Sequence, residues 1–357
     1  MRAWPPLLQV LRDPARMGTL DLAAWQLALR QALSANLSAT LHALALEHGQ
    51  LEAVPAPVRA HLDWAARQAA RHVQAVDWEI VQIARALAPL DLPLILLKGA
   101  AYTAARLPAA RGRLFSDIDI LVPRTALAAV ESALMLHGWV ATHLDEYDQR
   151  YYRQWMHEIP PLLHARRDTA IDVHHAILPL TARAHPDPDK LRAAARPLPG
   201  PGRLQVLAPA DMVLHSATHL FYDGEFDKGL RDLVDLHRLL REAGAEPGFW
   251  DALLPRAREL ALVRPLYYAL RYCTRLLDTP VPPAVLAALA GAAPPALLAL
   301  MDALFERALM PPHASCADRW TALARGLLYV RGNWLRMPPL LLVRHLFHKA
   351  FLSPKVK

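Results

Sequence analysis

Residues 94–122 read LILLKGAAYTAARLPAARGRLFSDIDILV, and this stretch decides the fold. Its first four residues form a short, fully apolar run, which predicts a buried strand. Residues 100–107 have helical spacing, and a polar, basic loop follows them. Residues 117–122 then alternate acidic and aliphatic side chains, a pattern typical of a second strand. Strand, helix, loop and strand in this order predict an α/β unit.

The segments downstream of this unit extend it into a small sheet. Residues 125–137 predict a helix, and residues 139–142 a further strand. The runs 159–165 and 170–177 predict an antiparallel pair joined by a turn. Residues 179–209 are rich in Pro and Ala and predict an irregular connection.

Helical patterns flank this centre on both sides. Residues 1–90 and 210–357 show apolar residues at three- and four-residue steps, interrupted by Pro and Gly. The chain is therefore predicted to be an α+β protein. Its domains would be an N-terminal helical region (1–90), a small mixed-sheet core (91–209) and a C-terminal helical region (210–357).

Composition excludes several classes of protein. Of the 357 residues 54% are apolar and 20% are charged, so the chain can bury a core and is not disordered throughout. Cys273 and Cys316 have no metal-ligand spacing, which argues against a disulfide scaffold or a structural zinc site. No window approaches 18 uninterrupted apolar residues, so no membrane span is predicted. The expected location is the cytoplasm.

The charge balance favours an anionic partner. The formal net charge is +7 and the isoelectric point about 9.6, which suits a nucleotide, a nucleic acid or a membrane surface. The tail 331–357 alternates basic with apolar and aromatic residues. It is expected to be an amphipathic helix packed on the core, with peripheral contact to an anionic membrane or RNA as the alternative.

Three acids carry the chemical prediction. Asp117 and Asp119 are two positions apart on a predicted strand, so their side chains point to the same face. Asp172, on the later strand, can join them, and His174 would share its face. Carboxylates held together repel one another unless a cation offsets their charge, and Mg²⁺ is the usual one. Two solvated aspartates on an edge strand are the alternative.

Basic residues near the acids are candidates for phosphate binding. Lys98 is the only lysine in the first 189 residues and follows four aliphatic residues. Gly99 marks a tight strand-to-helix turn whose N–H groups can face a phosphate. Arg111 and Arg113 in the following loop can reach the same ligand.

For other polar residues the sequence leaves two interpretations open, one functional and one structural. His157 and Glu158 can line an acceptor pocket or lie in a solvated loop. His215 and His219 are four apart on a predicted helix and either bind a metal or occupy an ordinary helix face. His174 either binds a metal or acts in acid–base catalysis, or it is a structural histidine held by hydrogen bonds.

The stretch LLKGAAYTAARLPAARGRLFSDIDILV, followed by AIDVHHAI, resembles the bacterial uncharacterised nucleotidyltransferases of the polymerase β-like superfamily. The resemblance covers roughly residues 90–240. It implies a polymerase β-like core in which Asp117, Asp119 and Asp172 are catalytic and bind Mg²⁺ or Mn²⁺. It also implies that Gly99 and Ala100 open the nucleotide-binding turn. Further positions that recur in the family block are Lys98, Arg113 and Ser116.

A second, looser similarity concerns the helix with Arg231 and Asp235, which resembles the RDxxD segment of abortive-infection nucleotidyltransferase toxins. In those proteins the segment lies near the active site. The four-residue spacing of Arg231 and Asp235 equally suits an ion pair within one helix.

The resemblance implies transfer of a nucleoside monophosphate from an NTP to an acceptor. The acceptor would be a small molecule, a tRNA end or a protein hydroxyl. Ala100 stands where the superfamily usually has Ser or Gly, which supports one alternative, a catalytically reduced nucleotide-binding or scaffold protein. The basic isoelectric point supports another, a toxin-like tRNA nucleotidyltransferase.

Overall fold

A computed structural model describes residues 4–142, 146–200 and 202–338 of the chain. The predicted basic tail therefore lies outside the described residues from position 339 onward. No helix in the described part is both long and apolar enough to cross a bilayer.

Within the described residues the strands form one mixed sheet in the order β3-β4-β5-β2-β1-β7-β6. Strand β1 is antiparallel to β2 and parallel to β7, whereas β2 and β5 are parallel. The strands are β1 (Leu94–Leu96), β2 (Asp117–Leu121), β3 (Trp139–Ala141), β4 (Leu162–His164), β5 (Ala170–His174), β6 (Arg196–Pro197) and β7 (Leu204–Val206). The predicted α+β class with a small mixed sheet is confirmed.

One sequence prediction in this region is wrong. Residues 179–209 are not wholly irregular, because they contain helix α8 (Pro188–Ala193) and strands β6 and β7. Strand β7 pairs with β1, Leu94 lying opposite Leu204. The strands have only two or three residues each, too few for period-two alternation to stand out among Pro and Ala.

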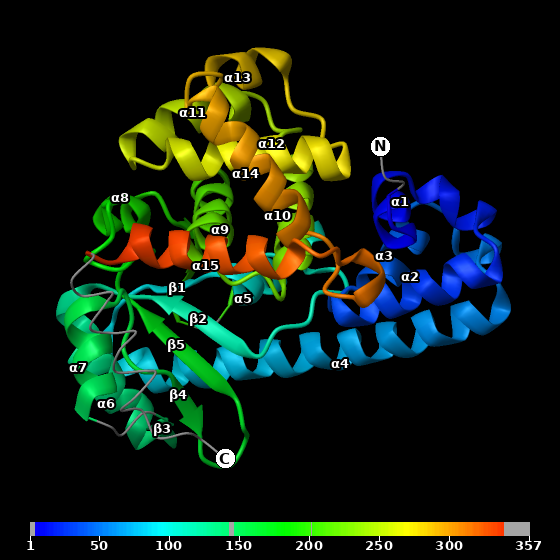
Figure 1. Cartoon of the computed structure of the whole chain (residues 1–357). Coiled ribbons are helices and arrows are strands. Elements are labelled where there is room, and N and C mark those ends of the chain that lie inside the picture. Colours follow the sequence, from blue (N-terminus) through cyan, green and yellow to red (C-terminus); the bar gives the residue numbers. More distant parts are fainter. Residues whose placement is uncertain (1–3, 143–145, 201, 339–357) are drawn as a thin grey trace.

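Helices surround the sheet. In Figure 1 the long helix α4 crosses the view at the level of β5, whereas α9 and α10 rise above β1. The helices before the sheet are α1 (Pro6–Arg12), α2 (Leu22–Ser34), α3 (Ser38–Glu47) and α4 (Ala56–Leu87). Those between strands are α5 (Lys98–Ala104), α6 (Leu127–Leu136) and α7 (Glu146–Trp155). Those after the sheet are α9 (Pro209–Asp223), α10 (Gly229–Ala243), α11 (Phe249–Glu259), α12 (Val263–Leu277), α13 (Pro283–Ala288), α14 (Pro295–Ala308) and α15 (Thr321–Arg336).

Sequence explains where the helices next to the sheet begin and end. Helix α4 starts after Pro55, and its buried positions Val58, Leu62, Ala65 and Ala69 repeat at helical steps. Helix α9 stops at Gly224, which has a φ of 88°. A Cβ there would lie 3.1 Å from the Leu328 carbonyl oxygen, so the close passage of α15 also requires glycine.

One core joins all three predicted regions. Buried apolar side chains from Leu7 to Leu335 belong to a single contiguous cluster. Trp25, Tyr102 and Phe305, one from each region, are almost fully buried in it. The division at residues 90 and 209 stays a prediction.

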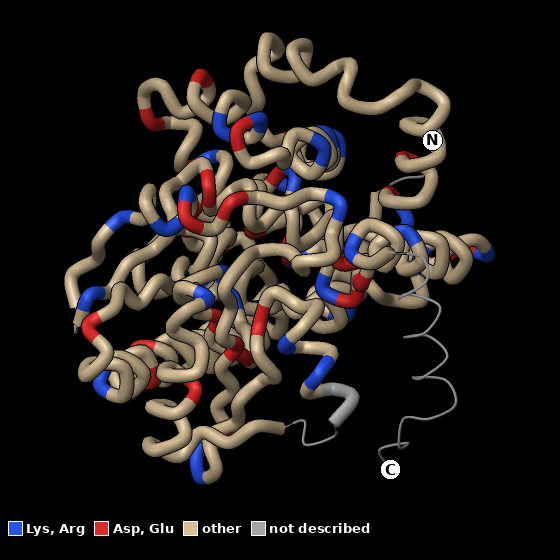
Figure 2. Tube along the Cα trace, turned by 90° about the vertical axis from the view of Figure 1, so that its left-hand side faces the viewer, with Lys and Arg blue, Asp and Glu red and all other residues tan. Residues whose placement is uncertain are grey.

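Charged residues of both signs are interspersed over the molecule. In Figure 2 blue and red segments alternate along much of the chain, and red segments gather near the middle of the view. Many exposed arginines are matched by nearby acids, for example Arg106 with Asp77 and Arg153 with Glu131. Such pairs add little to stability, but they reduce the reach of the basic charge.

Candidate functional site

The turn from β1 into α5 brings a lysine into the protein interior. Lys98 has a φ of 44°, in the left-handed region that residues with a side chain seldom adopt. The sequence predicts the tight turn at Gly99, but the φ of Gly99 is not positive. The Nζ atom of Lys98 lies 2.9 Å from Asp119 Oδ1. The strained turn thus places a half-buried ammonium group against a candidate metal ligand.

Gly99 is needed for another reason, the close packing of side chains against the start of α5. A Cβ on this residue would lie 2.2 Å from Arg113 Nη1 and 2.6 Å from Phe115 Cδ1. Both neighbours are parts of side chains that form the wall of the candidate site. Glycine at position 99 therefore allows Arg113 to lie against the start of α5.

We expect Gly99→Ala to lower the free energy of unfolding by about 1–3 kcal/mol, because the methyl group must displace Arg113 or Phe115. Urea denaturation checks this value. Gly326→Ala is the matched control, since nothing lies within 4 Å of a Cβ there and position 326 is inside α15. That variant should be stabilised by up to about 1 kcal/mol. Equal effects at the two positions would contradict the packing role.

The parallel pairing of β2 and β5 sets two acids side by side. Asp119 lies opposite Asp172 in the register, and Leu121 lies opposite His174. Ligand atoms of Asp119, Asp172 and His174 lie within 4.8 Å of one another. The predicted convergence of acids from two strands is thus seen for Asp119 and Asp172. Among the described residues Asp117 is not in this tight group.

Asp117 lies at the edge of the cluster. It is the first residue of β2, is half-buried, and accepts a hydrogen bond of 3.2 Å from the exposed Ser116 Oγ. Its side chain faces the same cavity as that of Asp119. Ser116 is therefore close to the acids but outside the cavity wall.

The electrostatics of the two paired acids differ. Burial raises the pKa of Asp119, but the Lys98 ammonium and the hydrogen bond from His174 outweigh it and hold that pKa well below its usual range. Burial, together with the neighbouring Asp119 and Glu158, raises the pKa of Asp172 to about 7. Asp119 is thus charged, whereas at Asp172 burial and the two neighbouring carboxyl groups outweigh the effect of His174.

This donor set fits a divalent cation. Asp119, Asp172 and Asp117 supply the carboxylate oxygens that Mg²⁺ and Mn²⁺ prefer. The raised pKa of Asp172 indicates that positive charge is in short supply beside it. A cation bound between the carboxylates would supply that charge.

A cavity of about 360 Å³ opens beside the acids. It lies between the sheet and the start of α10. Its walls come from two parts of the chain, residues 98–119 and 216–235. The polar lining side chains are Lys98, Tyr102, Arg113, Asp117, Asp119, Ser216, His219, Asp223, Glu225, Asp227, Lys228, Arg231, Asp232 and Asp235. Ala100 and Asp172 do not line it; Ala100 is buried within α5, and Asp172 is on the strand beyond Asp119.

Arg113 is a buried cation in the wall of this cavity. Its Nε donates to Asp235 Oδ2 at 2.6 Å, and both side chains are 6% exposed. The guanidinium group lies over the rings of Phe115 and Tyr102, 5.2 and 5.6 Å from their centroids. Its Nη1 is buried and has no hydrogen-bond partner among the residues that the structure describes. Such a donor suits an anionic ligand.

The predicted ion pair between Arg231 and Asp235 is wrong. Arg231 pairs with Asp232 at 2.6 Å, whereas Asp235 pairs with Arg113. The reason is long-range packing, since α10 directs Asp235 at a loop more than a hundred residues earlier. Both residues line the cavity, and their role in a site stays a prediction.

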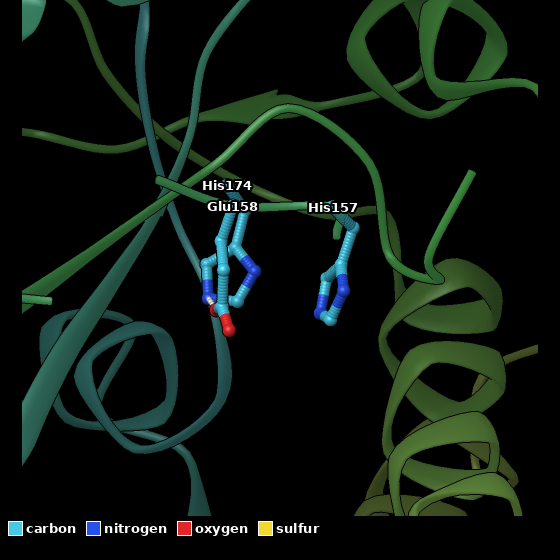
Figure 3. Close-up of side chains that lie close together, drawn as sticks. All are labelled: His157, Glu158 and His174. Carbon is cyan, nitrogen blue, oxygen red and sulfur yellow. Dashed lines mark ion pairs between the residues drawn. The ribbon is translucent and has the colours of Figure 1, made fainter. Parts of the chain in front are cut away.

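His157 and Glu158 are also not in a solvated loop. Glu158 forms a β-bridge with His174, and its Oε2 lies 3.4 Å from His174 Nε2. Figure 3 shows His157 and Glu158 beside His174. The Nε2 atom of His174 also donates to Asp119 Oδ1 at 2.9 Å. His174 thus joins the two acids, and its pKa is raised because Glu158 and Asp119 outweigh the effect of burial.

The other predicted histidine pair, His215 and His219, lies near this group but outside its tight cluster. His219 lines the cavity, and burial followed by the charge of Lys98 lowers the pKa of His215 to about 3. Neither residue belongs to a metal-type cluster among the described residues. A neutral helix face is what the structure supports for them.

Sequence reasoning missed most of the second cavity wall. Asp223, Glu225, Asp227 and Asp232 surround the turn from α9 into α10. The charge-rich stretch DGEFDKGLRD was the available signal. It has no motif spacing, and only the tertiary fold brings it to the acids of β2.

A comparison with protein families matches the model described as "uncharacterised nucleotidyltransferase" to residues 21–278. The match covers well over half of the chain and includes both walls of the cavity. Searches of curated proteins and of solved structures found no significant similarity.

Proposed function

Because the chain belongs to the uncharacterised nucleotidyltransferase family, we propose that it moves a nucleoside monophosphate from an NTP to an acceptor hydroxyl with the help of Mg²⁺ or Mn²⁺. One observation carries this proposal. The parallel register of β2 and β5 pairs Asp119 with Asp172 beside a cavity that also holds Lys98 and Arg113.

The cavity suits a nucleotide in size and charge. A volume of about 360 Å³ is within the range of small-ligand sites. Arg113 Nη1, which lacks a partner, would donate to a phosphate oxygen, and Lys98 would turn from Asp119 to the same group. The rings of Tyr102 and Phe115 hold the Arg113 guanidinium in place.

The acids would hold the metal and the acceptor. Asp117, Asp119 and Asp172 would bind the divalent cation, which supplies charge stabilisation for the phosphates and the departing pyrophosphate. Asp172 lies outside the cavity wall on the neighbouring strand, so it is suited to orient the acceptor hydroxyl and accept its proton. A bond forms from the acceptor oxygen to the α-phosphorus, and the α–β phosphoanhydride bond breaks. The residues thus act by positioning and electrostatics.

The test is transfer of label from each α-³²P-NTP with Mg²⁺ or Mn²⁺ and cell extract as the acceptor source. We expect one labelled acceptor species and at least about 100-fold less label with Asp117→Asn, because a metal ligand is lost. Asp168→Asn is the matched control, since it makes the same change at an exposed turn of left-handed φ that asparagine tolerates.

The outcomes separate the alternatives. Labelled tRNA would select the toxin-like tRNA nucleotidyltransferase, and a labelled small molecule or protein would name that acceptor class. Metal-dependent NTP binding without transfer would favour the catalytically reduced nucleotide-binding protein. Absence of both binding and transfer would refute the proposed function.

A further inference from the structure

A second group of potential metal ligands adjoins the acid cluster. One nitrogen each of His157 and His174 and one carboxylate oxygen of Glu158 lie within 4.8 Å of one another. Figure 3 shows the three side chains together, with Glu158 in front of His174 and the His157 ring to one side. The group is built by the bridge between residue 158 and the end of β5, so its backbone is held by the sheet.

Two imidazole nitrogens in this group form no hydrogen bond with the described residues. Nδ1 of His157 and Nδ1 of His174 are both buried and have no hydrogen-bond partner in the described part of the chain. His174 is 2% exposed, so water does not satisfy its Nδ1 from bulk solvent. In Figure 3 the ring nitrogen of His174 that is remote from the dashed ion pair faces His157. Buried polar atoms without partners are costly, which indicates that a ligand normally satisfies them.

The surrounding charges favour a cation. The carboxyl groups of Asp119, Glu158 and Asp172 act on this region. Two basic side chains, Lys98 and Arg336, act on it as well and are outnumbered by these acids. A cation between the imidazoles and Glu158 would offset that excess.

We propose that His157, Glu158 and His174 bind a borderline divalent cation, Zn²⁺ being the best match, in addition to the cation of the aspartates. Two imidazoles with one carboxylate suit Zn²⁺, whereas Mg²⁺ prefers oxygen ligands alone. Three protein ligands leave a coordination position open, as in zinc sites that bind water or substrate. This site does not depend on the proposed nucleotidyl transfer.

The test measures metal binding with no reference to transfer activity. The full chain, freed of metal, is dialysed at pH 8 against limiting Zn²⁺ and its metal content is determined. Co²⁺ serves as the spectroscopic probe, since its visible absorption reports nitrogen ligands. We expect one Zn²⁺ per chain, and at least tenfold weaker binding in His157→Gln and in Glu158→Gln.

Two controls keep the result interpretable. His48→Gln makes the same change at an exposed histidine and should leave Zn²⁺ binding unchanged. Asp117→Asn should lose transfer but keep its Zn²⁺, so failure of the proposed function and failure of this site are distinguishable. Thermal denaturation verifies that each variant is folded. A wild-type chain without Zn²⁺, or equal Zn²⁺ affinity in folded His157→Gln, would overturn the proposal.

Discussion

Replacing Asp119 by asparagine is expected to reduce nucleotidyl transfer by about 10³-fold or more and to lower the free energy of unfolding by about 2–3 kcal/mol. Transfer suffers because the substitution removes a carboxylate that the proposed cation needs. Stability suffers because Asp119 is 3% exposed and accepts from both Lys98 and His174 at 2.9 Å. Without it the half-buried Lys98 ammonium loses its ion-pair partner.

A double variant separates the two effects. In Asp119→Asn/Lys98→Met neither charge remains, so most of the lost stability should return while transfer stays absent. Urea denaturation gives the stabilities, and transfer of α-³²P label gives the activity. Full activity in the folded single variant would remove Asp119 from the site.

Arg113→Met is expected to lower the free energy of unfolding by about 3–5 kcal/mol, because it leaves the Asp235 carboxylate buried and unpaired. The two atoms of this ion pair are 2.6 Å apart and water reaches neither side chain well. The same variant should also weaken NTP binding, because it removes Nη1, a donor in the cavity wall that has no partner within the described part of the chain.

Arg113→Met/Asp235→Leu distinguishes stability from binding. Removing both charges should restore most of the stability, since two apolar side chains replace a desolvated pair. NTP affinity, measured by titration calorimetry, should stay low in the double variant. If the double variant regained NTP binding, the guanidinium would not contact the nucleotide.

Local sequence patterns were sufficient to predict the strands that carry the aspartates. They did not predict which side chains form ion pairs with those aspartates. Alternation over residues 117–122 predicted β2, and the i, i+2 spacing put Asp117 and Asp119 on one face. That Asp172 can join these acids was also predicted, but its place opposite Asp119 in a parallel pair of strands was not. Lys98 was recognised as unusual, but its ion pair with Asp119 depends on a left-handed turn that no local pattern indicates.

Long-range contacts account for the rest of the site. A four-residue spacing favoured a pair between Arg231 and Asp235, yet the burial of Arg113 gave Asp235 a stronger partner from the sheet. Glu158 lies before a short strand in a stretch with little periodicity, so its bridge to His174 was not predictable from spacing. In both cases tertiary packing decided between two local options.

The pairing of β1 with β7 has a consequence for chain synthesis. A ribosome makes Leu94–Leu96 about a hundred residues before Leu204–Val206, the strand that covers their free edge. During that interval β2 can pair with one side of β1, while the other side presents unpaired peptide groups between apolar side chains. The central sheet is therefore closed only after the whole segment that carries Asp117, Asp119 and Asp172 has emerged.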